Sequence, residues 1–103
     1  NIHFICLNSY DVDRSVNGEM YNWLESDLQS TDQEWLIAFW HHPAYTKGGH
    51  NSDDINDSGG RLVEMRENFL PILESAGVQP YKFTDAKLHK TDLVATKEQL
   101  NQN

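Results

Sequence analysis

Three of the five histidines in this chain fall within ten residues, directly after an apolar stretch. They are His41, His42 and His50, with Pro43 and Tyr45 between them. Neutral imidazole is the commonest metal ligand in proteins, and its pKa near neutrality also suits proton transfer. Their spacing alone matches no established short metal-binding motif. The cluster is therefore either a metal-binding or catalytic site or a set of solvated loop histidines.

The stretch before this cluster, Trp35–Trp40, is apolar throughout. This pattern predicts a central strand of a parallel sheet that is covered on both faces. In a parallel α/β sheet, ligands bind beyond the carboxyl ends of the strands. His41 is the first residue past this strand, and since adjacent side chains diverge, we expect only one of the neighbouring histidines to face the site. A glycine pair, Gly48 and Gly49, allows the loop to return His50 toward His41.

The surrounding elements that must position these histidines follow a regular pattern. The apolar stretch Ile2–Leu7 is typical of a strand. Apolar residues recur at helical spacing in Glu19–Gln29 and again in Arg61–Ala76, where Pro71 is expected to kink or divide the helix. Gly77 suits the position just after a helix end. With the central strand, these elements predict an α/β fold in βαβα order, with a parallel sheet.

The sequence after Val78 departs from this pattern. A third strand should follow the second helix, but the letters QPYK stand there instead. Leu93, Val94 and Leu100 favour a helix that is capped by Thr91. We therefore divide the chain into a partial domain, residues 1–78, and a divergent, helical tail, residues 79–103.

The composition excludes several classes of partner. The net charge of the 103 residues is −8, which argues against nucleic acid as a partner because phosphate backbones select basic surfaces. No apolar stretch reaches the length of about 18 residues that a membrane span needs, so no contact with a membrane is expected. The single cysteine, Cys6, allows no internal disulfide, and its apolar neighbours predict a buried core thiol.

The order of these motifs resembles the calcineurin-like metallophosphoesterase superfamily, in its bacterial branch that is similar to purple acid phosphatases. That family shows a strand, H-x-P-x-Y, a histidine nine residues on, a Met-Arg pair that opens a helix, and a strand near Gly-Val. The corresponding residues here are His41, Pro43, Tyr45, His50, Met65, Arg66, Gly77 and Val78. The resemblance covers about residues 1–78 and implies part of an αββα sandwich.

The resemblance also implies roles for single residues in the hydrolysis of a phosphate ester. It makes His41 a ligand of a dinuclear centre of Fe, Zn or Mn, in which the metal ions lie about 4 Å apart and activate the attacking water. It makes His50 the residue that contacts the substrate phosphate or protonates the leaving group, while His42 and Tyr45 shape the loop. Arg66 either binds phosphate or forms a salt bridge on the helix surface.

Most metal-ligand motifs of the family are missing, however. D-x-H, G-D-x-x-Y and G-N-H should precede this segment and G-H-x-H should follow it, and none is present. One imidazole cannot hold two ions, since even a single zinc site normally takes several protein ligands. Two hypotheses stay open. The chain is a fragment of a metal-dependent phosphoester hydrolase that is inactive alone, or it is a non-catalytic truncated relative that acts as a self-associating structural module.

The predicted sheet is small, so some of its strand edges have no partner strand. Unpaired strand edges and uncovered apolar surface are templates for association, so we expect a homo-oligomer. For the compartment, the sequence itself gives no indication, and only the family resemblance suggests a secreted or periplasmic protein.

Overall fold

The computed structural model describes residues 1–78 and 91–96. Its elements are β1 (Ile2–Cys6), α1 (Glu19–Ser30), β2 (Trp35–Trp40), η1 (Asp57–Gly60), α2 (Arg61–Glu64), η2 (Met65–Phe69), α3 (Leu70–Ser75) and β3 (Thr91–Thr96). The mixed α/β class is confirmed. The αββα sandwich stays a prediction, because the described parts of the chain contain a single sheet. No helix within those parts is long and apolar enough to cross a membrane.

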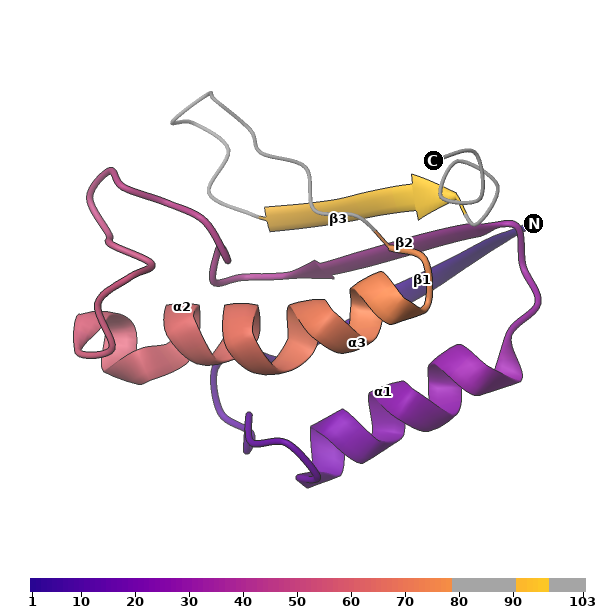
Figure 1. The fold of residues 1–103 in the computed structure, drawn as a ribbon, viewed down its shortest axis with the longest axis horizontal. Coiled ribbons are helices and arrows are strands. Elements are labelled where there is room, and N and C mark those ends of the chain that lie inside the picture. The colour runs from indigo at the N-terminus through magenta and orange to yellow at the C-terminus, as the bar shows by residue number, and fades with distance from the viewer. Residues whose placement is uncertain (79–90, 97–103) are drawn as a thin grey trace.

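Strand β2 is the centre of the three-stranded sheet. It pairs in parallel with β1, with Ile2 opposite Trp35, and antiparallel with β3. Just past the end of β1, the N–H of Leu7 donates to the carbonyl of Phe39 at 3.0 Å. The carboxyl ends of β1 and β2 therefore meet at one edge of the sheet, where the long loop begins (Figure 1). The parallel pairing expected from the sequence is confirmed for β1 and β2, whereas the antiparallel β3 makes the sheet mixed rather than parallel.

Strand β3 corrects the prediction for the tail. A helix capped by Thr91 and marked by Leu93 and Val94 was expected, but these residues lie in the strand Thr91–Thr96. Pairing with β2 supplies hydrogen-bond partners on the side of this segment that faces β2, and a local apolar pattern does not reveal such a distant partner. Leu100 lies outside the described residues. Since β3 and β1 flank β2, the central strand has a neighbour on both edges.

The hydrophobic core lies between the sheet and the helices, which Figure 1 shows on one side of it. Alternate residues of a strand point to opposite faces, and helical residues at spacings of three and four share a face. The buried cluster comprises Ile5, Leu7, Leu24, Leu28, Leu36, Ala38, Trp40, Ala44, Met65, Phe69, Leu70, Leu73 and Val78. Most of these residues come from β1, β2, α1 and the helical run that begins with α2, and the connecting segments add Leu7, Ala44 and Val78. The predicted apolar faces therefore pack against one another.

The other face of β1 is exposed to solvent. Ile2 and Phe4 are 46% and 62% exposed, and Cys6 is exposed as well. The alternate residues of β2, from Trp35 to Phe39, are half-buried. The predictions of a buried Cys6 thiol and of a strand covered on both faces are therefore wrong within the described residues. The reason is that all helices described there pack on the same side of the sheet (Figure 1).

The second helix runs from Arg61 to Ser75 and changes its pitch before Pro71. Segment η2 is a π-helix, in which the N–H of Leu70 donates to the carbonyl of Met65, five residues back. Pro71 has no N–H with which to continue the α-helical ladder, and the wider turn accommodates this loss. The expected irregularity of the helix near Pro71 is confirmed, as a π-helical turn that separates α2 from α3.

A Schellman motif ends this helix. Gly77 has a φ of 103°, and its N–H donates to the carbonyl of Glu74 at 3.0 Å. The N–H of Val78 donates to the carbonyl of Leu73 at 2.9 Å, and both side chains are fully buried. This pair of hydrogen bonds requires a left-handed residue at the helix end, as the glycine predicted.

Candidate functional site

The candidate site lies at the edge of the sheet where β1 and β2 both end (Figure 1). Ser9 and Tyr10 follow β1, and His41 and His42 follow β2. The long loop then leads from the end of β2 to η1 and α2. The fold thus brings the histidine pair to the place where parallel α/β sheets bind their ligands.

His42 is the buried member of the histidine pair, with 7% of its surface exposed. Its Nδ1 lies 2.6 Å from the hydroxyl of Ser9, which also accepts the backbone N–H of His42 at 3.2 Å. Its carbonyl accepts a hydrogen bond from the indole N–H of Trp40. Burial, and to a lesser degree the charge of His41, lowers the pKa of His42 to about 4. His42 is therefore a neutral side chain that anchors the loop.

His41 is exposed beside this anchor. Its ring centroid lies 4.9 Å from that of His42 and 6.5 Å from that of Tyr10. The ring of Tyr10 also lies 4.6 Å below the guanidinium carbon of Arg61, whose Nε donates to the Tyr10 carbonyl at 3.1 Å. Two rings thus lie beside that of His41. Within residues 1–78, its nitrogens enter no hydrogen bond, so both are available to a ligand.

His50 lies in the long loop, and 65% of its side chain is exposed. Its Nδ1 lies 2.9 Å from Oδ1 of Asp57. The same carboxylate accepts the backbone N–H of Asn51 at 2.6 Å and the hydroxyl of Ser58 at 2.9 Å. These donors, the Asn51 amide foremost, hold the pKa of Asp57 below its usual range. His50 is therefore attached to the loop through one ring nitrogen.

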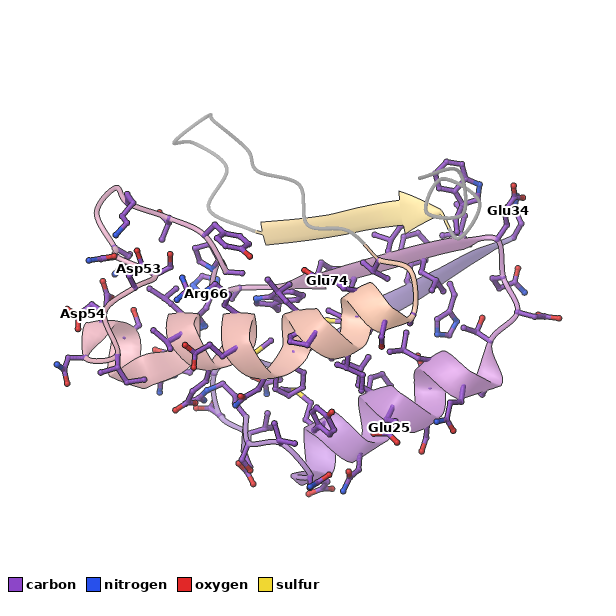
Figure 2. All side chains as sticks on the ribbon, viewed as in Figure 1. Glu25, Glu34, Asp53, Asp54, Arg66 and Glu74 are labelled. Atoms are coloured by element: carbon purple, nitrogen blue, oxygen red, sulfur yellow. The ribbon has the colours of Figure 1, made fainter. Side chains whose placement is uncertain are left out.

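Arg66 points from η2 toward the loop and meets Asp53 there (Figure 2). Its Nη1 donates to Oδ1 of Asp53 at 2.8 Å, and its guanidinium carbon lies 5.8 Å from the ring centroid of Tyr45. Lys47 binds the same carboxylate. Hydrogen bonds from Lys47 and from Arg66 lower the pKa of Asp53. This ion pair agrees with the salt-bridge role considered for Arg66, and phosphate binding by it stays a prediction.

The candidate residues do not form one metal-binding set. No hydrogen bond or ring contact joins His41 to His50 within the described residues, although the charge of His50 contributes to the low pKa of His42. The same residues contain no group of three or more His, Cys, Asp or Glu side chains that could hold a metal ion. On their own, the residues described here therefore do not fit a dinuclear centre.

Neither Ser9 nor Asp57 was predicted from the sequence. The contact between Ser9 and His42 joins residues 33 positions apart, so no local pattern predicts it. The positions of the strand ends could have indicated this contact. Ser9 follows β1 and His42 follows β2, and the carboxyl ends of neighbouring parallel strands lie together. Asp57 is one of several acidic residues in a polar loop, and nothing in its type distinguishes it from Asp54.

Comparison with known proteins points to purple acid phosphatases. Over 80 residues, or 75% of its length, the chain is 34% identical to probable purple acid phosphatase 20 of Arabidopsis thaliana. Over 48 residues, or 44% of its length, it is 40% identical to purple acid phosphatase 15 of the same plant. The matched segments span 17% and 9% of these relatives.

This homology is weak and suggests the metallophosphoesterase superfamily. No family model matches the chain, and no solved structure matches it. Both relatives are plant proteins, so the comparisons do not support the bacterial branch.

Proposed function

We propose that this chain is a segment of a metal-dependent phosphoester hydrolase and that it is inactive alone. The homology to purple acid phosphatases over 75% of the chain carries this proposal. The exposed imidazole of His41 at the carboxyl end of β2 supports it. In the proposed role, His41 supplies one ligand to a dinuclear centre of Fe, Zn or Mn, which acts as the Lewis acid of the reaction when bound.

His50 has the second role in this proposal. It contacts the phosphate group of the substrate or gives a proton to the leaving group, and such a general acid typically contributes about 10²–10⁴-fold to the rate. The substrate is a phosphate ester. The remaining metal ligands, and the second sheet of an αββα sandwich, would have to come from outside the described residues.

The isolated chain should not hydrolyse an aryl phosphate, with or without added Mn²⁺, Zn²⁺ or Fe³⁺. The reason is the number of ligands, since one imidazole cannot fix a pair of ions in place. Release of the phenolate, followed by absorbance, tests this expectation. Metal-dependent turnover that copurifies with the chain and disappears in His41→Ala would contradict it.

Zinc should bind weakly, and at His41 rather than at His3. His3 is the matched comparison, because its Nε2 already lies 2.6 Å from Asp27. In a zinc titration followed by NMR of the ring signals, we expect the largest shift at His41. His41→Ala should abolish the response and His3→Ala should keep it. A response that survives in His41→Ala would argue against this histidine as a ligand.

The open face of β1 favours a second candidate function, that of a non-catalytic, self-associating structural module. Ile2 and Phe4 expose apolar surface side by side on one strand, on the sheet face opposite the helices. Contiguous exposed apolar surface is typical of protein interaction sites. In this alternative, the chain forms a homo-oligomer and its histidines carry out no chemistry.

A further inference from the structure

The carboxylate of Asp57 is itself held in a fixed position. Its side chain is 17% exposed, and its two oxygens accept hydrogen bonds from the amide of Asn51 and the hydroxyl of Ser58. Its own backbone N–H donates to the carbonyl of Asp54 at 3.0 Å. An acceptor that is bound by several donors and lies at the first residue of η1 has little freedom to turn away from His50.

This carboxylate determines which nitrogen of His50 carries the proton. An ionised carboxylate only accepts hydrogen bonds, so Nδ1 of His50, at 2.9 Å from Oδ1, must be the donor. The neutral ring then has no proton on Nε2. Since 65% of the side chain is exposed, Nε2 is accessible from solvent. A histidine whose other nitrogen is bound to a carboxylate presents Nε2 in one tautomer and one orientation.

We propose that Asp57 is a positioning residue for His50, which it holds with Nδ1 protonated and Nε2 presented to a phosphate ester. This inference rests on the proposed function of His50. In the protonated ring, Nε2–H is the group that can reach the leaving group. A water molecule forms the new bond to phosphorus and loses a proton to solvent. As the P–O bond of the ester breaks, the leaving oxygen takes the bonding electrons and the Nε2 proton, and inorganic phosphate and a neutral ring with Nδ1–H on Asp57 remain.

The test is the tautomer of His50, measured by ¹⁵N NMR of the 103-residue chain above the pH at which its ring titrates. We expect the neutral ring to carry its proton on Nδ1, whereas free histidine prefers Nε2 protonation. In Asp57→Ala, the two nitrogen signals should exchange positions. Asp54→Ala is the matched control, because Asp54 lies in the same loop and carries the same charge, and its carboxylate accepts only the N–H of Asn56 among the described contacts.

The wild-type spectrum decides the question even if Asp57→Ala does not fold. An Nε2–H tautomer at His50 in the wild-type chain overturns the inference, and so does an unchanged tautomer in folded Asp57→Ala. Titration with inorganic phosphate tests the proposed function separately. A phosphate-dependent shift of the His50 Nε2 signal supports that function. If the Nδ1–H tautomer is observed but phosphate causes no shift, phosphate contact by His50 is contradicted. The positioning role of Asp57 is still supported in that case.

Discussion

At the level of single residues, the contact between Ser9 and His42 explains why only one of two adjacent histidines is exposed. The hydroxyl of Ser9 binds both Nδ1 and the backbone N–H of His42, so this side chain is drawn into the fold. His41, the preceding residue, must then point away because adjacent side chains diverge. The sequence predicted that one of the pair faces the site, and the family resemblance selected His41. The anchor that separates the two residues became visible only in the structure.

The burial of His42 gives the metal-free chain a pH-dependent stability. Its pKa is about 4 in the folded state against an ordinary value of 6.5. Between these values, the unfolded chain binds a proton that the folded chain does not. The free energy of unfolding should therefore fall as the pH drops below about 6.5, with the loss complete below about 4. With about 1.4 kcal/mol per pKa unit, the total loss is on the order of 3 kcal/mol.

Urea denaturation at several pH values measures this slope. His42→Gln should lower the stability at neutral pH and flatten the slope between about pH 5 and 6.5, a window in which carboxylates titrate little. His3→Gln is the control, because His3 is a partly buried histidine on β1, whereas His42 follows β2. If the slope in His42→Gln equals that of the wild type, another group is responsible for it.

At the level of the elements, the first two-thirds of the chain was largely predictable. The helix α1 and the strands β1 and β2 lie where the apolar spacing predicted them, because each buries one continuous face in the same core. Strand β3 was missed, since its stability depends on pairing with β2 rather than on its own pattern. The π-helix η2 was foreseeable only as an irregularity near Pro71.

The Schellman motif at the end of α3 should contribute measurably to stability. Gly77→Ala places a Cβ on a residue with a φ of 103°, and we expect the free energy of unfolding to fall by about 1 kcal/mol. Gly48→Ala is the matched control, because its Cβ would meet no atom within 4 Å. Denaturation with urea compares the two variants. Equal stabilities would mean that the left-handed residue is not required at this helix end.

At the level of the whole molecule, the described helices and their core lie on one side of the sheet only. No local pattern predicted this asymmetry, because an apolar strand such as β2 has the same sequence whether one face or both are covered. Ile2, Phe4 and Cys6 consequently stand on an open face. Whether these side chains are buried depends on what packs against the open face of the sheet. The sequence of β1 alone does not determine this.

We expect the open face to drive self-association of the isolated chain. Burying apolar surface is favourable, and a two-fold dimer buries the same patch on both copies. Sedimentation equilibrium at micromolar concentration should detect the dimer, and Phe4→Ser should shift it toward monomer. Val16→Ser is the control, because Val16 is 51% exposed in a loop away from β1. A folded wild-type chain that stays monomeric would exclude this mode of assembly.

The position of Cys6 also makes the open face chemically addressable. The chain contains one sulfhydryl, and it lies on β1 in register with Phe39 of β2. A thiol-reactive dye therefore labels this face and no other place on the molecule. The rate at which the dye attaches reports the fraction of molecules in which this face is exposed. If a second copy is the cover, dilution alone quickens the labelling.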